Sequence, residues 1–305
     1  MRIIITKHKK MLSRMKIAFK LLLKLFFRVF LLVLGSIILT IILKVFCFAS
    51  FKVPSGSMEP TLKTGDYIIV NKLIFGPRIF KDWKFWADGN WEMKRLKGLR
   101  AIKRNEILVF NFPVVDNDWS KIEMDFNAHY VKRCVGIPGD IFYIENGFYK
   151  VKGCTDTLGI YNNQLRLSNK VDSTFKNTVF NCFPFNNIQH WTMKNFGPLY
   201  IPRSGDFLKI DILNIGVYKK LIEYETGLTV TQQGNVILLN DSCINSYTFK
   251  TNYYFMAGDL VFDSIDSRYW GLLPEDHIIG KVAFVWKSED IKTGKFRWER
   301  FFKGV

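Results

Sequence analysis

The longest uncharged apolar run in the chain covers residues 29–43, and after Lys44 the apolar residues continue over 45–51. Together the two runs are about as long as the roughly 20 helical residues that cross the hydrocarbon core of a bilayer. The flexible side chain of Lys44, near one end, can extend its charge to the membrane surface. The pattern predicts one transmembrane anchor over residues 29–51, and no second run of this length follows it.

Beyond the anchor, short apolar runs separated by turn residues predict β-strands. These runs are rich in β-branched and aromatic residues, which favour strands. Asn146-Gly147 between two apolar runs is the strongest short signal for a β-hairpin, here over residues 141–151. Further strands are expected at residues 67–72, 107–113, 129–136, 236–239 and 278–286. The part of the chain after the anchor is therefore expected to be mainly β.

Two stretches interrupt this pattern. Residues 152–235 contain many Asn, Lys and Thr and only short apolar groups, so we expect an inserted, β-rich cap region between core segments 52–151 and 236–305. Residues 75–100 alternate aromatic rings with cations, a composition that suits either a membrane interface or a small satellite core. The aromatic and cationic residues concerned are Phe80, Trp83, Phe85, Trp86, Trp91, Lys81, Lys84, Lys94, Arg95 and Lys97.

Charge gives the anchor a direction. The chain has 305 residues and a formal charge of +17, yet residues 1–28 hold nine of its cations and no acid. A basic tail directly before an apolar run is expected to stay in the cytoplasm and to contact anionic phospholipids rather than nucleic acid. Residues after about 52 should then lie on the outer, periplasmic face of the cytoplasmic membrane, in a single-pass arrangement.

The segment Cys47-Phe48-Ala49 raises the alternative of a cleaved secretory signal, because small residues at this spacing are typical of cleavage sites. A basic segment of 28 residues is long for such a signal, and cleavage there would leave the following serine-containing stretch at a ragged terminus. We therefore expect an uncleaved anchor.

Cysteines and histidines indicate little chemistry. Four of the five cysteines follow the anchor, where disulfides can form, but their spacing does not say whether they pair. No pair of cysteines has the spacing of metal ligands, and the four histidines are scattered. We expect neither a metal site nor a cofactor. The four cysteines are Cys134, Cys154, Cys182 and Cys243.

A stiff stretch, residues 53–62, follows the anchor directly. Pro54 and Pro60 restrict their own φ angles, and Gly56 permits a backbone conformation that a β-carbon would penalise. Ser57 is therefore expected in an unusual, rigid turn. Such a turn suits a nucleophile, and it equally suits an ordinary loop at the exit from a membrane.

Lys132 lies within the strand expected at residues 129–136. Because side chains alternate along a strand, it shares a face with Tyr130 and Cys134. A lysine among apolar neighbours could act as a base, but lysines in sheets more often protect an edge strand against aggregation. The strand pattern by itself leaves both interpretations open.

Four ordered blocks carry a family resemblance. They are Ser55-Gly56-Ser57-Met58 with Pro60, Gly65-Asp66, residues 130–140 and residues 263–271. In this order after an amino-terminal anchor, they resemble the bacterial type I signal peptidases, membrane serine proteases that release exported proteins from their leader peptides. The resemblance covers residues 29–76, 104–151 and 236–287, and it implies an all-β catalytic core behind a transmembrane helix.

The resemblance implies a catalytic role for several residues. Ser57 matches the nucleophile and Lys132 the general base of a Ser–Lys dyad, a variant of the catalytic triad. Burial without a counter-ion would lower the pKa of such a lysine and make the neutral amine available. Ser55 and the Ser57 N–H match the oxyanion donors, Ser264 matches a residue that holds the lysine, and Asp266 and Arg268 match a structural ion pair.

The same resemblance implies the substrate. A leader peptide would pair as an extended strand beside residues 130–132, a form of β-augmentation. Small pockets would then accept Ala-x-Ala before the cut, and the partners would be signal-peptide-bearing preproteins, with the secretion machinery as a further candidate. The residues matching the substrate site are Phe51, Val53, Pro54, Met58, Tyr130 and Val131.

One block departs from the family pattern. After Gly258-Asp259 the family usually has polar residues, whereas this chain has Leu260-Val261-Phe262. The departure raises the alternative of a catalytically impaired relative that serves as a binding or assembly module. A serine hydrolase with His129 or His277 as base is a third alternative, although His129 is opposite in phase to Lys132 on the strand.

Overall fold

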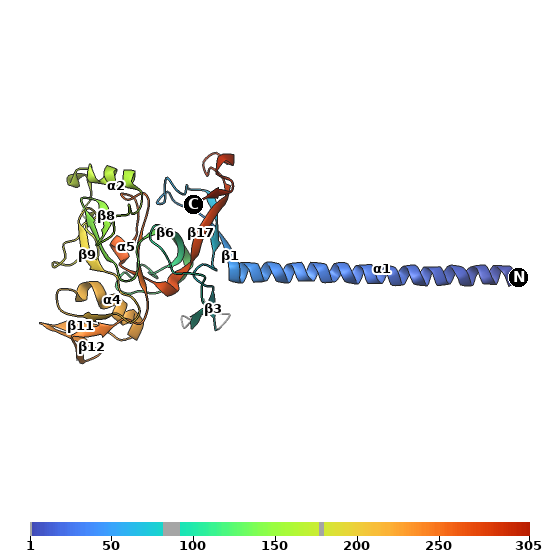
Figure 1. The fold of residues 1–305 in the computed structure, drawn as a ribbon, viewed down its shortest axis with the longest axis horizontal. Helices are drawn as coiled ribbons and strands as arrows, with labels where there is room; N and C mark the ends of the chain where they lie inside the picture. Colours follow the sequence, from blue (N-terminus) through green and yellow to red (C-terminus); the bar gives the residue numbers. More distant parts are fainter. Residues whose placement is uncertain (1, 82–91, 177–179) are drawn as a thin grey trace. The chain divides into compact units, whose positions relative to one another are not determined.

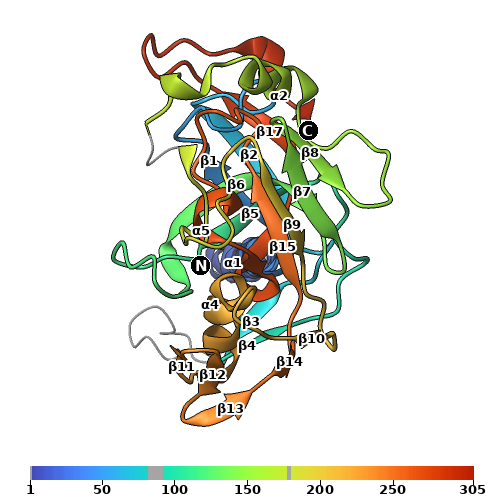
Figure 2. The same ribbon diagram turned by 90° about the vertical axis from the view of Figure 1, so that its left-hand side faces the viewer.

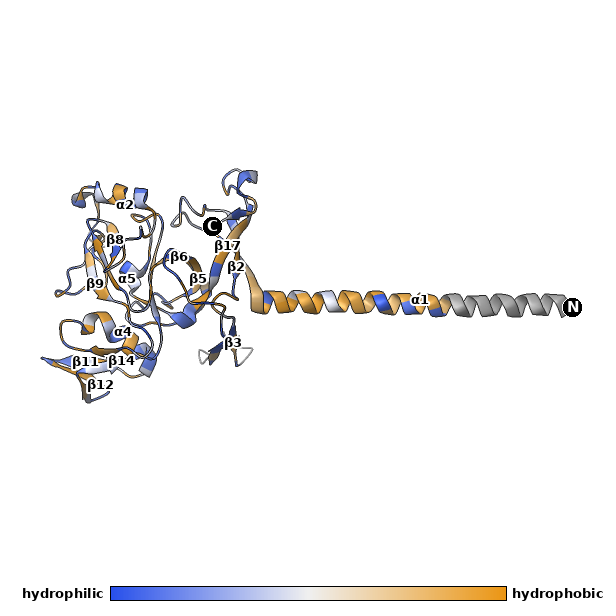
Figure 3. Cartoon of the chain, viewed as in Figure 1, coloured by the Kyte–Doolittle hydropathy of each residue, from blue (hydrophilic) through white to orange (hydrophobic). Residues whose placement is uncertain are grey.

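The computed structural model describes residues 2–81, 92–176 and 180–305, with side chains from Phe19 onward (Figure 1). The chain forms two compact units, residues 1–47 and Phe48–Val305. The first unit is helix α1 (Arg2–Ile42) followed by a short π-helical turn, η1 (Leu43–Cys47). Within it Phe19–Cys47 is long and apolar enough to cross a membrane, and Figure 3 shows the apolar residues along this helix.

The end of the expected anchor differs in the structure. The sequence pattern placed the anchor at residues 29–51, but β1 (Phe48–Lys52) is an antiparallel strand paired with β2 (Asp66–Asn71). The apolar run therefore contains two different elements. Hydropathy alone does not separate them, because both are apolar; pairing with β2, from Phe48↔Asn71 to Lys52↔Tyr67, decides where the helix ends.

The second unit is built on an eight-stranded sheet, which confirms the expected mainly β fold. Its strand order is β1-β2-β17-β5-β6-β15-β16, with β18 paired to β17. β5 lies in the middle and is buried along its whole length, as its unbroken apolar run predicts. The remaining bounds are β5 (Ile107–Phe112), β6 (Asp125–Gly136), β15 (Tyr253–Ala257), β16 (Leu273–Pro274), β17 (Ile278–Ser288) and β18 (Lys303–Gly304).

Three smaller sheets complete this unit beside the hairpin β3–β4 (Figure 2). The expected Asn-Gly hairpin is confirmed, with Asn146 and Gly147 at φ angles of 51° and 85° between β7 and β8. The sheets are β8-β7-β9, β10-β14 and β11-β12-β13. Their strands are β7 (Ile141–Glu145), β8 (Phe148–Val151), β9 (Phe196–Tyr200), β10 (Phe207–Lys209), β11 (Val230–Gln233), β12 (Val236–Leu239), β13 (Ser242–Ile244) and β14 (Ser246–Thr248).

Helices also occur in the stretch expected to be a β-rich insertion. Among the described residues they include α2 (Tyr161–Ser168), η2 (Asp172–Thr174) and α4 (Ile215–Thr226). α4 buries Ile215, Tyr218 and Ile222, a spacing of three and four residues that places them on one helical face. Strand pairs β7–β9 and β11–β12 also cross the expected insertion boundaries at residues 151 and 236. The division into core and cap remains a prediction.

The basic and aromatic stretch at residues 75–100 partly turns inward. β3 (Arg78–Phe80) pairs with β4 (Met93–Arg95). Arg78 donates to the backbone oxygen of Asp276 at 2.9 Å, and Arg95 donates to that of Ile278 at 2.6 Å. These two cations therefore help to fix the start of β17. The residues Trp83, Lys84, Phe85, Trp86 and Trp91 lie outside the described part of the chain.

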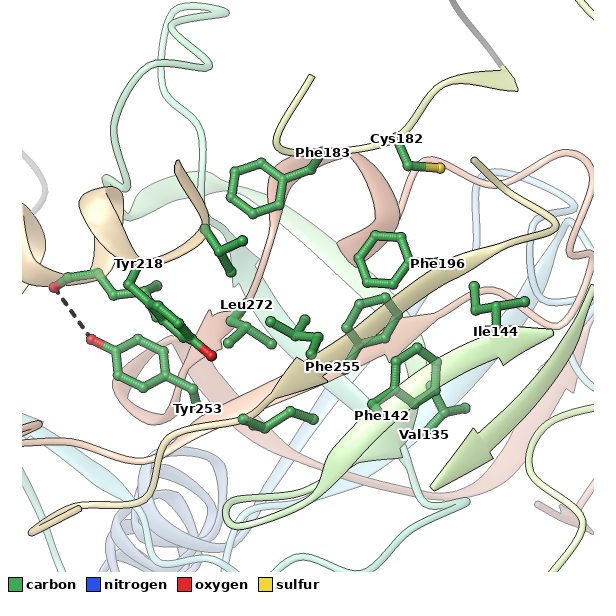
Figure 4. Close-up of a cluster of buried hydrophobic side chains, with 14 of the residues drawn as sticks. Val135, Phe142, Ile144, Cys182, Phe183, Phe196, Tyr218, Tyr253, Phe255 and Leu272 are labelled. Carbon is green, nitrogen blue, oxygen red and sulfur yellow. Dashed lines mark hydrogen bonds between the residues drawn. The ribbon is translucent and has the colours of Figure 1, made fainter. Parts of the chain in front are cut away.

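One hydrophobic core joins the large sheet to the smaller ones. Phe255 of β15 stacks on Phe142 of β7 with ring centroids 4.2 Å apart, and Phe196 of β9 meets it edge-on at 5.4 Å (Figure 4). Tyr218 of α4 belongs to the same buried cluster. Burying each such ring contributes about 2 kcal/mol or more. β7, β9 and α4 are thereby packed against β15, directly before the loop that follows it. All five cysteines are free thiols.

Candidate active site

The loop that carries Ser57 is closed at its base by two backbone hydrogen bonds. Val53 donates to the oxygen of Asp66 at 2.8 Å, and Gly65 donates to the oxygen of Val53 at 2.9 Å. Within the loop, Met58 is fully buried in an apolar cluster with Val53. The buried Met58 side chain and the closed base hold the neighbouring Ser57 in one position.

Lys132 lies on β6 opposite Leu108 of β5, and its side chain is buried, with 3% exposed. Its Nζ and the Ser57 Oγ are hydrogen-bonded at 2.5 Å. Burial disfavours the ammonium and lowers the pKa of Lys132 to about 8, although the charge of Asp266 partly opposes this shift. A lysine in this environment is neutral in a useful fraction of molecules near physiological pH.

Gly258 lies between Ser264 and the backbone of Ser57. A β-carbon added at Gly258 would lie 2.1 Å from the Ser264 Oγ and 2.8 Å from the Ser57 backbone oxygen, so only glycine fits between the two serines. The Ser264 hydroxyl is buried and, among the residues that the structure describes, has no hydrogen-bond partner. Leu260 donates its N–H to the Ser57 backbone oxygen at 3.0 Å.

Asp266 and Arg268 form a fully buried ion pair with two contacts of 2.8 Å. Asp266 also accepts the N–H of Gly258 at 3.0 Å. Burial by itself would raise the pKa of Asp266, but the Arg268 charge and its hydrogen bonds outweigh burial and lower it. The pair therefore stays ionised and fixes the turn that presents Gly258 to Ser57.

A cavity of about 420 Å³ opens in front of Ser57. Its lining includes most of the residues that the sequence assigned to substrate binding, whereas Met58 lies beneath the loop and does not line it. β6 pairs with β15 only from Arg133 onward, so within the described residues 130–132 have no strand on that side. The substrate-site residues in the lining are Phe51, Val53, Pro54, Tyr130 and Val131, together with Ser55.

The two histidines considered as alternative bases are differently placed. His129 lines the same cavity, with its ring 5.0 Å from that of Phe51, and burial lowers its pKa below 6.5. His277 is fully buried beside Asp276, with its Nδ1 2.8 Å from the carboxylate. In the described part of the chain neither imidazole is hydrogen-bonded to a serine hydroxyl.

Asn163 of α2 is a site residue that the sequence did not reveal. Its buried side-chain amide donates to the backbone oxygen of Glu59 at 3.1 Å and to that of Asp259 at 2.7 Å. It thus links the Ser57 loop to the loop after β15. No local signal could have identified it, because its acceptors are backbone atoms about a hundred residues away in either direction.

Two buried carboxylates brace the same loops. Asp259 pairs with Arg133, the neighbour of Lys132, at 2.7 Å and accepts the Thr61 hydroxyl at 2.5 Å. Asp66 accepts two N–H groups of Arg300 from the short helix η4 (Trp298–Arg300), and Arg300 also donates to the Thr61 backbone oxygen at 3.0 Å. Arg300, near the carboxyl end of the sequence, therefore helps to hold the loop that carries Ser57 in place.

A family model described as signal peptidase, peptidase S26, matches residues 26–287 of this sequence. The chain belongs to the signal peptidase family. A signal peptidase I from Buchnera aphidicola subsp. Schizaphis graminum is 28% identical over 271 residues, which cover 85% of this chain and 74% of the relative. The signal peptidase I of Haemophilus influenzae is 26% identical over 295 residues, which cover 88% and 72%.

A crystal structure of a signal peptidase I from Enterococcus faecalis matches 60% of this chain and 98% of its own length, at 16% identity and a TM-score of 0.27. The mainly β fold of this chain is shown by its own strand pairing, in the order β1-β2-β17-β5-β6-β15-β16.

Proposed function

We propose that this chain is a membrane-anchored serine endopeptidase that removes amino-terminal signal peptides from exported preproteins, with Ser57 as nucleophile and Lys132 as general base. The observation that carries the proposal is the 2.5 Å hydrogen bond between Ser57 Oγ and the buried Lys132 Nζ. A nucleophile within hydrogen-bond reach of a base of lowered pKa is the arrangement that hydroxyl activation requires. Membership of the signal peptidase family supports the same assignment.

The chemistry follows from this contact. Once Lys132 is neutral, its lone pair takes the Ser57 proton while Oγ bonds to the scissile carbonyl carbon. The oxyanion is stabilised by the Ser57 N–H and the Ser55 hydroxyl, an assignment supported by the presence of both residues in the cavity lining. Lys132 then gives its proton to the leaving amine as the C–N bond breaks. Water, deprotonated by Lys132, finally hydrolyses the acyl-enzyme ester and restores Ser57.

Substrate binding uses the unpaired side of β6. A leader peptide lies as an added strand beside Tyr130 and Val131, with its backbone hydrogen-bonded to theirs. The cavity is small and has the apolar walls of Phe51, Val53 and Pro54. These walls accept alanine-sized side chains at the first and third positions before the cut, which gives the Ala-x-Ala preference.

The apolar helix segment Phe19–Cys47 supplies the membrane anchor, and phospholipids are its surroundings. The basic residues before it hold the amino terminus in the cytoplasm, so the Phe48–Val305 unit works on the outer, periplasmic face, where preproteins emerge from the secretion machinery. Washing membranes with alkaline carbonate tests the anchor: the full chain should stay with the membrane, and extraction would contradict it.

The activity is tested with the full chain purified in detergent and a preprotein whose leader ends in Ala-x-Ala. Sequencing of the new amino terminus should give cleavage directly after the second alanine. Ser57→Ala and Lys132→Ala should abolish cleavage, and His129→Ala should retain it. Near-normal turnover by Lys132→Ala would refute the dyad, while binding without turnover by the unchanged chain would favour an impaired binding module.

A further inference from the structure

A second cavity, of about 460 Å³, adjoins the Ser57 cavity. The two share Asp263 and Ile265 in their linings, and Ser264 lies between those residues. The walls of the second cavity are mainly aromatic, from Trp119, Phe185, Phe262 and Tyr269. It is therefore an apolar extension of the same cleft, and the catalytic residues Ser57 and Lys132 do not line it.

Three separate parts of the chain form this second cavity. Trp119 comes from the β5–β6 connection, Phe185 from the stretch between α2 and β9, and Phe262 from the loop after β15. Two apolar side chains are open to solvent there, since Phe185 is 58% and Ile265 53% exposed. Phe185 has a φ of 56°, a left-handed conformation that is unfavourable for a bulky residue and that is found preferentially at binding sites.

Phe262 belongs to the departure from the family pattern. Where the family usually has polar residues, its ring packs against the core cluster and forms part of the cavity wall. The ammonium of Lys170 covers it at 4.4 Å from the ring centroid. A polar side chain at this position would remove that wall. The part of the cavity wall that Phe262 forms thus depends on this departure.

The position of the second cavity relative to Ser57 indicates what could occupy it. The leader half of a substrate fills the first cavity, between the segment before Ser57 and β6. The half that leaves must extend beyond Ser57. The second cavity is open to it there, because Asp263 and Ile265 line both cavities and Ser57 lines the first. An extended chain advances about 3.3 Å per residue and presents alternate side chains to one face.

We propose, on the basis of the function proposed above, that the second cavity binds a large apolar or aromatic side chain from the first three residues of the released mature protein. The specificity of this chain then extends to both sides of the cleaved bond: it favours small residues before the bond and one bulky residue after it. An apolar pocket of this kind is expected to change kcat/KM by about tenfold for a side chain that fills it.

The test uses peptides with one leader ending in Ala-x-Ala and with alanine or tryptophan at the first, second or third position after the cut. For each enzyme the measured quantity is the ratio of kcat/KM for the tryptophan peptide to that for the alanine peptide. The unchanged chain should give a ratio of about ten at one of the positions. Phe185→Ser and Phe262→Asn should reduce that ratio to about one. Because the ratio is taken within each enzyme, general damage to the fold cancels.

Val171→Ser is the matched control, because Val171 is an exposed apolar residue of the same inserted stretch, 65% exposed, outside either cavity lining. It should keep the ratio of the unchanged chain. A ratio near one at all three positions in the unchanged chain, or a high ratio that survives both cavity substitutions, overturns this inference alone. Failure to cleave any of the peptides overturns the proposed function and this inference with it.

Discussion

The lowered pKa of Lys132 leads to a quantitative pH dependence. Burial lowers this pKa from 10.5 to about 8. At pH 7 about one molecule in ten then carries the neutral amine, against about one in three thousand for an unperturbed lysine. Desolvation of the side chain thus raises the fraction of neutral Lys132 about 300-fold, before any contribution from its contact with Ser57.

The perturbation is pH itself, between 6 and 10. If only the neutral lysine is active, kcat/KM should rise about 90-fold between pH 6 and 9, tenfold per unit at first, and level off above about 8. The assay is steady-state cleavage of one Ala-x-Ala peptide in detergent. Because kcat/KM reports groups of the free enzyme, its inflection should give the pKa of Lys132 directly.

Two results would refute this reasoning. An inflection on the acid side of an ordinary histidine would indicate His129, since burial lowers the pKa of that imidazole. A rise that continues without levelling to pH 10 would indicate a lysine whose pKa is unperturbed, so that burial would have no role in its activation. A buried lysine, a histidine and a lysine of unperturbed pKa differ in the pH at which the profile levels off, so a single titration separates the three cases.

Further predictions concern stability and loop positioning. Lys132→Met should stabilise the fold by roughly 2–3 kcal/mol at pH 7, measured by denaturant unfolding, while abolishing activity. Between about pH 8 and 10.5 the folded wild-type protein binds fewer protons than the unfolded protein, so wild-type stability increases with pH in that range. The stability gained by Lys132→Met should therefore shrink as pH rises from about 8 to 10.5. A gain that does not depend on pH would contradict this prediction. Gly258→Ala should lower kcat at least tenfold, because the added β-carbon would displace Ser264 or Ser57. An unchanged kcat would show that the loop after β15 can move enough to accommodate the β-carbon. Asn163→Asp keeps the shape of the side chain but cannot donate to the Glu59 and Asp259 carbonyl oxygens. We therefore expect kcat to fall with little change in KM. A lower Tm with normal kcat would instead mean that Asn163 acts only on stability. Arg300→Ala should leave the buried Asp66 carboxylate short of its main partner and cost about 3 kcal/mol of stability, with equal Tm values for mutant and wild type as the contrary result.

The family, the mainly β fold and the candidate reactive residues could all be predicted from the sequence. Three elements of the structure follow from local signals in the sequence. They are the apolar helix with its basic flank, the Asn-Gly hairpin and the buried strand β5. Ser57 and Lys132 could be named as candidates from short blocks alone. Their separation of 75 residues meant that nothing in either block could establish contact between them.

Tertiary structure decided what depends on partners distant in sequence. Pairing with β2 ends the apolar helix before Phe48, because from this residue onward the backbone N–H and C=O groups are hydrogen-bonded to β2 and not within a further helical turn. The burial that lowers the pKa of Lys132 comes from the packed sheet and loops, whereas a strand pattern also fitted an edge lysine. Asn163 donates to backbone oxygens, and Arg300 donates to a backbone oxygen and a buried carboxylate. Phe185 and Phe262 line one cavity only in the folded chain. Residue type and order determined which chemistry was available; only packing determined which groups are desolvated and within reach of each other.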